Sequence, residues 1–554
     1  MKKRRSVFFV FLGMVLTNVI SNYAYKRFDL TEDHRFTLSQ AALESTSNFR
    51  SPVVVDVLLD GELPGEIARL QRETVLLLEQ FQAENKNIVY NLVNPLEEQE
   101  TRNETIANLQ QLGLKPVSIT VEDNGKTTQE LVFPWAMVNH KNKTVKVPLL
   151  KNKLGATSED RINNSVQNLE YAFADAFKKL QIVQKKKIAV LKGNGELADQ
   201  YIADLLTDLK EYYNIGAITL DSVEKNAQKV LYQLSDFDMA VIAKPTETFT
   251  EKEKYVLDQY LIKGGRSLWM IDQVAMELDS LFNETGSNVA VRQDINLDDF
   301  FFRYGVRINP VLINDLYNTP IVVANGEANE SQYNPLPWVY HPMVFSKDNH
   351  PINNNIEALR LQFANTIDTI TNANKKTVLL QSSPLSKTEG VPQQIGFAKL
   401  NTTLDKKDYP PHTGFPLAVL LEGPFSSAYV NRIKPIDLER PIEKGGENKM
   451  IVIGDGDIIR NQLQQGRPLE LGYDKWTGNS YGNKEFLVNC INYLLDDSGF
   501  INIRGKNVSI PLLDVEKVAV HKTKWRLLTI GIPVFLVLLG GIFQTYWRKR
   551  KFAA

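Results

Sequence analysis

The sequence predicts an α/β protein held at a membrane, with two folded exterior domains between two apolar segments. Three observations support this prediction. A long apolar run ends the chain at residues 525–547, a second uncharged run follows the first five residues, and strand patterns alternate with helix patterns between them. Alternating strands and helices are typical of sheets covered by helices.

The last apolar run has the length of a membrane helix. No charged residue lies between Leu527 and Trp547, and Arg548–Lys551 follows at once. A span needs about 20 mostly apolar residues. Pro533 and Gly540-Gly541 would weaken a soluble helix, but membrane helices tolerate them. A buried core helix is the alternative, which the length and the four cations disfavour. We predict a span at 525–547 and a basic cytoplasmic tail at 548–554.

The N-terminal residues, like the C-terminal ones, combine a group of cations with an uncharged stretch. Lys2–Arg5 precedes the uncharged stretch Ser6–Tyr25. A cleaved signal peptide would begin in the same way, but no A-x-A-like cleavage site follows. We therefore favour an uncleaved anchor at 1–25. Because positive charge stays on the cytoplasmic side, both termini are expected inside, with a juxtamembrane linker at 506–524 and residues 26–524 outside.

Composition excludes one class of partner and one kind of cross-link. Lys plus Arg is 64 and Asp plus Glu is 65, a net charge of −1, which gives no electrostatic case for nucleic acid. The single cysteine, Cys490, allows no intrachain disulfide. It lies on the apolar face of a predicted helix at 485–495 and is interpreted as a small buried hydrophobe.

The first exterior domain, 26–155, has the element order of a thioredoxin-like fold. Strand, helix and strand patterns form a β-α-β unit, and a hairpin and a last strand follow; a right-handed crossover would make the first two strands parallel. The segments are Val53–Leu59, Glu66–Ala83, Asn87–Val93, Val117–Val121 with Glu130–Phe133 around Asp123-Asn-Gly125, and Lys143–Val147. Without a C-x-x-C motif this is predicted as a binding version. The amphipathic helix Ser158–Leu180 is interpreted as a connector at 156–184, with a homodimer contact as a second reading.

The second exterior domain, 185–505, is predicted as a parallel sheet covered on both faces. Near-continuous apolar strands alternate with helices, as in parallel sheets. The strands are Ile188–Leu191, Met239–Ala243, Ser267–Ile271 and Met450–Ile453, and the helices Tyr201–Tyr212 and Glu251–Ile262. A large insertion at about 275–440 carries further strands at Val306–Ile313, Val378–Gln381 and Leu417–Leu421.

Each of these four strands ends in a polar or glycine-rich turn. In open α/β sheets ligands bind outside the carboxyl ends of the strands. The turns are therefore predicted to converge on one crevice for a ligand or a partner segment. Its residues would be Gly193, Asn194, Gly195, Glu196, Lys244, Asp272, Asp455 and Asp457. The alternative is a set of ordinary surface turns on a fold whose ancestral site has decayed.

Several short motifs together resemble one family. They are Phe28–Glu32 with Phe36–Ser39, Gly193–Glu196, Tyr260–Gly265, Gly454–Asp457 and Gly482–Asn489. Their order is similar to that in auxiliary components of ABC-type transport systems, in particular the gliding-motility-associated GldG family of the Bacteroidetes. The resemblance implies a permease and an ATPase as partners, an inner-membrane location with a periplasmic bulk, and a role in gliding and its secretion machinery. It also implies that the second domain resembles class I glutamine amidotransferases in fold, which does not carry the chemistry with it.

Signals for catalysis are weak. Gly478-Asn-Ser-Tyr-Gly482 matches G-x-S-x-G, but a polar loop precedes Ser480 where a nucleophile elbow needs a strand. The chain has no G-x-x-x-x-G-K-[ST] for ATP and no H-E-x-x-H for zinc. Asp455 and Asp457 could hold a hard cation, though such a pair more often only ends a strand. We therefore predict no catalytic residue, metal or cofactor. The expected function is a non-catalytic anchored subunit; the alternative is a periplasmic hydrolase or amidotransferase-like enzyme.

Overall fold

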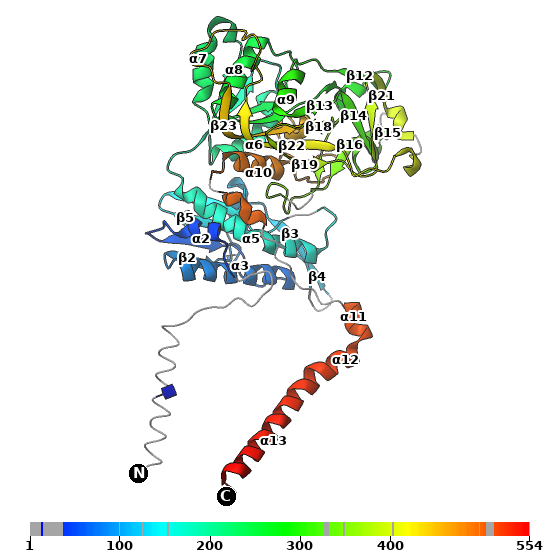
Figure 1. Cartoon of the computed structure of the whole chain (residues 1–554). Coiled ribbons are helices and arrows are strands. Elements are labelled where there is room, and N and C mark those ends of the chain that lie inside the picture. The colour runs from blue at the N-terminus through cyan, green and yellow to red at the C-terminus, as the bar shows by residue number, and fades with distance from the viewer. Residues whose placement is uncertain are drawn as a thin grey trace. The chain divides into compact units, whose positions relative to one another are not determined.

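The computed structural model describes residues 13–14, 37–98, 100–123, 126–151, 154–325, 332–346, 350–401, 404–497, 499–505 and 515–552. The chain forms two compact units, Met1–Asn507 and Val508–Ala554 (Figure 1). The anchor predicted at 1–25 lies outside the described residues, apart from 13–14, and so do Asn124 and Gly125 of the predicted hairpin turn.

The N-terminal part of the first unit is built on a four-stranded sheet in the order β2-β1-β5-β6. Its elements are β1 (Val53–Val57), α3 (Gly65–Glu84), β2 (Ile88–Leu92), β5 (Trp135–His140) and β6 (Lys143–Pro148). As predicted, β1 and β2 are parallel, and β5 and β6 run antiparallel. Sequence analysis missed β5, and it predicted a hairpin before the last strand. That hairpin, β3 (Val117–Asp123) with β4 (Lys126–Val132), is a separate two-stranded sheet.

Helix α5 (Ser158–Gln181) belongs to this N-terminal core and does not stand between domains. Thr157 caps it by accepting a hydrogen bond from the Asp160 N–H, and Lys178 and Lys179 lie in its last turn. Phe173 and Phe177 are fully buried among the side chains of the sheet and α3. The amphipathic pattern that suggested a connector is therefore explained by burial against this sheet. The part also contains α2 (Gln40–Thr46) and α4 (Arg102–Gln111).

A seven-stranded sheet forms the centre of the α/β part, in the order β19-β22-β23-β10-β9-β7-β8. Five strands are parallel: β8 (Asn214–Thr219), β7 (Lys187–Lys192), β9 (Met239–Ala243), β10 (Arg266–Met270) and β23 (Lys444–Ile453). Strand β22 (Pro416–Ser426) runs antiparallel to β23, and the edge strand β19 (Lys375–Gln381) pairs antiparallel with β22. Both were assigned to the insertion, but they extend the main sheet. Edge strand β8 was missed because it lacks a continuous apolar run.

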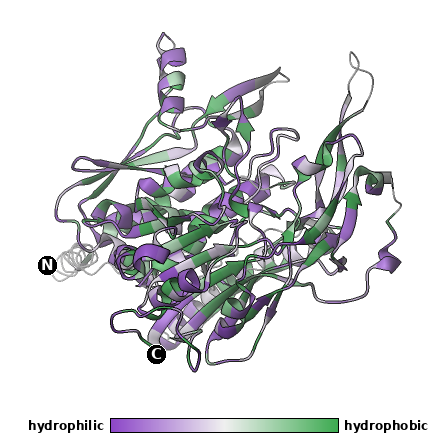
Figure 2. Ribbon diagram, turned by 90° about the horizontal axis from the view of Figure 1, so that it is seen from above, coloured by the Kyte–Doolittle hydropathy of each residue, from purple (hydrophilic) through white to green (hydrophobic). Residues whose placement is uncertain are grey.

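Helices cover both faces of this sheet, as predicted for parallel strands. Helices α7 (Val223–Ser235), α8 (Glu251–Ile262) and α9 (Asp298–Tyr304) pack on one face, and α6 (Asp199–Lys210) and α10 (Asn483–Leu495) pack on the other (Figure 1). The strands between them are strongly apolar (Figure 2). Helix α8 starts with a capping box in which Thr250 and Glu253 bond reciprocally.

The inserted region consists of small antiparallel sheets. These are β11 (Val274–Ala275), β12 (Ser287–Arg292) and β21 (Gln393–Gly396); β13 (Val306–Ile308) with β18 (Ile367–Thr369); β14 (Val311–Asp315) with β20 (Ser386–Gly390); and β15 (Asn318–Asn325), β16 (Gln332–Val344) and β17 (Leu359–Arg360). The strand predicted at 306–313 is two strands that pair with different partners. The break falls at Asn309-Pro310, where proline has no N–H to continue a ladder.

The second unit is one long helical segment. It comprises α11 (Val515–Val520), α12 (Lys522–Arg526), a π-helical turn (Leu527–Gly531) and α13 (Ile532–Phe552). Within the described residues, Lys522–Lys551 is the one helix long and apolar enough to cross a membrane, and 18 consecutive residues of it have a mean hydropathy of 2.2. The π-turn lies just before Pro533, whose missing N–H breaks the regular hydrogen-bond series.

Candidate functional site

Three parallel strands, β9, β10 and β23, deliver charged side chains to one edge of the main sheet. Their apolar residues are buried, and a charged residue follows each strand within two positions: Lys244 after β9, Asp272 after β10 and Asp455 after β23, with Asp457 two residues further on. Because the strands are adjacent and parallel, their carboxyl ends meet at the same edge. The structure therefore brings these four predicted residues together.

Lys244 is the centre of this cluster. Its Nζ lies 2.7 Å from Asp457 Oδ2, 3.1 Å from Glu277 Oε1 and 3.4 Å from Asp272 Oδ2. The Lys244 side chain is only 5% exposed. Burial by itself would lower the pKa of the ammonium, but the carboxylates of Asp272, Asp457 and Glu277 outweigh it and raise the pKa above its usual value. Lys244 is therefore a permanent buried cation.

Asp272 and Asp455 are buried acids of the cluster. Both Asp455 oxygens accept backbone N–H groups at 2.7 Å, one from Gln362 and one from Asp457. Burial, with the charges of Asp272 and Asp457, raises the pKa of Asp455 well above its usual range. Burial also raises the pKa of Asp272 to about 6, although Lys244 opposes the rise.

The backbone turn at Gly456 lies very close to the side chains of the cluster. Lys244 has a φ of 53°, a left-handed conformation that is uncommon for residues other than glycine. At Gly456, a Cβ would lie 2.6 Å from Lys244 Cγ and 3.0 Å from Asp272 Oδ2. Only glycine lets this turn pass so near to the lysine stem. The Gly456 N–H donates to Asp272 Oδ1 at 2.5 Å.

The fourth predicted turn, Gly193–Glu196, makes its contacts elsewhere. The backbone N–H groups of Thr246 and Glu247 donate to the Asn194 carbonyl, and the Asn194 N–H donates to Glu196 Oε2 at 2.8 Å. Glu196 is thus folded into its own turn, where burial raises the pKa of its carboxyl. This turn supports the loop after β9, and its residues are not among those that line the cavity described next.

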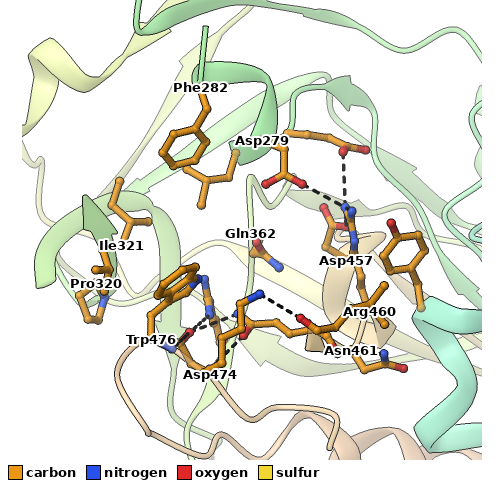
Figure 3. Close-up of a pocket in the computed structure, with 18 of the residues that line it drawn as sticks. Asp279, Phe282, Pro320, Ile321, Gln362, Asp457, Arg460, Asn461, Asp474 and Trp476 are labelled. Atoms are coloured by element: carbon orange, nitrogen blue, oxygen red, sulfur yellow. Dashed lines mark hydrogen bonds and ion pairs between the residues drawn. The ribbon is translucent and has the colours of Figure 1, made fainter. Parts of the chain in front are cut away.

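A cavity of about 450 Å³ adjoins the ion cluster. Asp457 and Glu277 belong both to the cluster and to the cavity wall. Figure 3 shows Pro320, Ile321, Phe282 and Trp476 on one side, and Asp457, Arg460 and Asn461 on the other. The cavity therefore has an apolar, aromatic side and a charged side. Its full lining is Tyr201, Glu277, Leu278, Asp279, Phe282, Pro320, Ile321, Val322, Ala324, Tyr333, Arg360, Gln362, Asp457, Arg460, Asn461, Gln462, Leu463, Asp474, Lys475 and Trp476.

Two arginines on the charged side are loosely paired. Arg460 lies 3.3 Å from Asp457 and 3.4 Å from Glu277, and its guanidinium is 4.7 Å from the centre of the Tyr201 ring. Arg360 lies 3.6 Å from Asp474, and its buried Nε has no hydrogen-bond partner among the described atoms. Charge-assisted hydrogen bonds are usually about 2.7–2.9 Å long. Of the two, Arg360 has a guanidinium nitrogen, Nε, that no described atom uses.

A lysine ammonium lies at the centre of the cluster. The Lys244 ammonium occupies the place between Asp272 and Asp457 that a cation would need. Within the described ranges, no group of three or more His, Cys, Asp or Glu side chains is placed to hold a metal ion. Ser480 is bridged to Tyr473 in a loop, and Cys490 is buried inside α10, where burial raises the pKa of its thiol.

Sequence reasoning missed most of the cavity wall. Arg460 follows Asp457 at a spacing of three residues, a weak pattern that could have paired them. Asp474 and Trp476 lie in a segment that was interpreted as polar loop, and Glu277 and Arg360 come from the inserted region. No local pattern connects these positions, because tertiary packing alone brings them together.

Comparisons with known proteins match both parts of the first unit. Residues 185–490 match the model of a family described as "ABC-type uncharacterized transport system", and residues 32–139 match a domain of unknown function. No curated protein matches the chain significantly. A solved structure named "mmIFT52 N-terminal domain" is 15% identical, covers 56% of this chain and 99% of its own, and has a TM-score of 0.33.

Proposed function

Because this chain belongs to the ABC-type transport family of auxiliary proteins, we propose that it is a non-catalytic, membrane-anchored subunit of an ABC transport complex. It sits in the inner membrane with the first unit on the periplasmic side. It acts by binding and by coupling to a permease and a cytoplasmic ATPase. The C-terminal helix, Lys522–Lys551, with its four terminal cations, supports anchorage with the C-terminus inside.

The observation that carries the non-catalytic assignment is the position of Lys244. In open α/β folds the carboxyl edge of the strands is the usual ligand site. Here the buried ammonium, held by Asp272, Asp457 and Glu277, fills that edge. A buried lysine with its pKa raised cannot act as a base. This favours a structural and binding role for the edge.

Finer features of the fold belong to the same proposal. The order β2-β1-β5-β6, with α3 crossing between parallel strands and α5 after the last one, supports a thioredoxin-like fold for the N-terminal part. The five-stranded parallel core of the main sheet supports likeness to class I amidotransferases. The motifs at 193–196, 260–265 and 454–457 support membership of the gliding-motility group, with a second span at 1–25.

Topology and partners test the proposal. Reporter fusions near residues 40, 300 and 510 should be active outside, and fusions at both termini inside. Affinity purification of the full chain in mild detergent should recover an ABC permease and its ATPase in fixed proportion. A C-terminal reporter active only outside, or purification without either partner, would refute the assignment. Turnover of nucleotide should follow the ATPase and be absent from the isolated chain.

A further inference from the structure

The cavity beside the ion cluster lies against the edge of strand β15 (Asn318–Asn325), and we propose that this edge binds an extended polypeptide segment by strand addition. Three consecutive residues, Pro320, Ile321 and Val322, line the cavity. Side chains of consecutive residues point to opposite faces of a strand. A space bordered by all three therefore lies along the edge of the strand and not over one face alone.

That edge is unpaired among the residues that the structure describes. Strand β15 is the outer strand of the sheet β15-β16-β17 and pairs only with β16. Ile321 faces the buried core of the inserted region, together with Trp338 and Tyr340 of β16. One face of β15 therefore packs against the core, and one edge of β15 pairs with β16. The other edge of β15 is open to another strand.

Prolines in β16 reveal which backbone groups point to the open side. Pro337 lies opposite Pro320, and Pro335 lies opposite Val322. Since proline has no N–H, these are the pairs that exchange no hydrogen bonds across the ladder. The Val322 N–H and C=O must then point away from β16, and so must those of Ala324, two residues further on. An extended peptide has matching groups at the same two-residue spacing.

The opposite wall supplies anchors for side chains. Trp476 is 58% exposed and Phe282 59% exposed, although both line the cavity. Exposed aromatic rings around a pocket are typical of binding sites. Arg360 also lines the cavity, and its Nε has no hydrogen-bond partner among the described atoms. The occupant is therefore a segment with apolar or aromatic residues at alternate positions. This deepens the proposed binding role and rests on it.

The test uses the full-length protein in detergent micelles and a displayed library of random octapeptides, the length of β15. We expect enrichment of peptides with apolar or aromatic residues at every second position. The enriched peptides, made synthetically, should bind the purified chain in fluorescence polarisation. No transporter partner is present, so failure of peptide binding and failure of permease co-purification are separate results.

Matched variants identify the surface. Trp476→Ala should weaken binding about tenfold or more, as loss of an aromatic anchor does. Phe302→Ala removes an exposed aromatic ring outside the cavity and should have no effect. Val322→Pro removes the outward N–H and should abolish enrichment, whereas Val322→Thr keeps it and should bind normally. Equal unfolding midpoints of these variants show that the fold is retained.

N-methylated peptides test backbone pairing without changing the protein. Methyl groups on one set of alternate residues should abolish binding, and methyl groups on the other set should be tolerated, because a strand pairs through every second residue. Equal loss with both sets, equal enrichment on the Trp476→Ala protein, or no enrichment at all overturns the proposal. Binding of neutral oligosaccharides without any peptide would assign the cavity to saccharides and also overturn it.

Discussion

Lys244 is the residue on which the charged edge of the sheet depends. It neutralises Asp272 and Asp457 inside the protein, at 3.4 Å and 2.7 Å. Replacing it with methionine keeps the volume, but it removes the counter-ion of Asp272 and leaves Asp457 with Arg460 alone. We expect Lys244→Met to lower the free energy of unfolding by about 3–5 kcal/mol, the usual cost of breaking a buried ion pair. Chemical denaturation of the full chain in detergent measures this loss.

A surface pair provides the control for that experiment. Lys252 lies 2.6 Å from Glu224, but both side chains are substantially exposed. Because solvent screens such pairs, Lys252→Met should cost less than about 1 kcal/mol. Equal effects of the two substitutions would show that the Lys244 cluster is not a buried charge network.

Asp272 predicts a pH dependence at the residue scale. Its folded-state pKa is raised to about 6 from an ordinary value of 3.8. Between these pH values the folded state keeps a proton that the unfolded state has lost, so raising the pH through the window removes stability. The contribution amounts to at most about 3 kcal/mol. The difference in unfolding free energy between the native protein and Asp272→Asn should therefore change between pH 4 and pH 6, and a constant difference would contradict this.

At the scale of elements, Glu485 in the first turn of α10 connects the two parts of the first unit. Its Oε1 lies 2.8 Å from Lys151 Nζ and 2.7 Å from Arg504. Arg504 belongs to the short helix Phe500–Gly505, and its guanidinium stacks on Tyr171 of α5 at 4.8 Å. Phe500 also packs into the N-terminal core. One helix terminus thereby joins the N-terminal core to the α/β part.

Glu485→Gln should loosen this junction. Burial would raise the pKa of Glu485, but Lys151 and Arg504 lower it overall, so the carboxylate is charged in the folded state. The neutral amide of the glutamine leaves Lys151 and Arg504 without their carboxylate partner. This should lower the free energy of unfolding by roughly 2–5 kcal/mol. Calorimetry should then resolve two melting transitions instead of one. Glu211→Gln, at the more exposed pair with Lys146, is the matched control and should leave a single transition.

At the scale of the whole molecule, the C-terminal helix is the element that a membrane partner can contact. Adjacent glycines, Gly540 and Gly541, permit close approach of another helix. Deleting 525–554 should release the chain from the permease. The truncated chain should remain in the membrane fraction if residues 1–25 form the predicted uncleaved anchor.

Affinity purification measures release from the permease, and alkaline extraction separately measures retention in the membrane. Full co-purification of the truncated chain with the permease would mean that the first unit makes the contact and the helix only anchors it. Complete release into the soluble fraction would mean that the N-terminal segment does not hold the chain in the membrane.

The sequence by itself determined the elements that depend on local pattern. The apolar runs of β7, β9, β10 and β23 and the polar residues that follow them were enough to predict a parallel sheet and the meeting of Lys244, Asp272, Asp455 and Asp457 at one edge. Hydrophobic periodicity and the polar residues at strand ends can both be recognised within short stretches of sequence. The length and charge pattern of the last helix were readable for the same reason.

Only the tertiary structure decided which distant segments share a surface. Strand β22 joins the main sheet by pairing with β23, and β19 joins it by pairing with β22; no local sequence pattern predicts either pairing. Helix α5 was interpreted as a connector because an amphipathic pattern predicts that one face is buried but does not identify the elements that bury it. The cavity takes Glu277, Ile321, Arg360 and Trp476 from four separate stretches. Contacts between residues far apart in sequence arise from packing of the whole chain, and a single sequence carries no local signal for them.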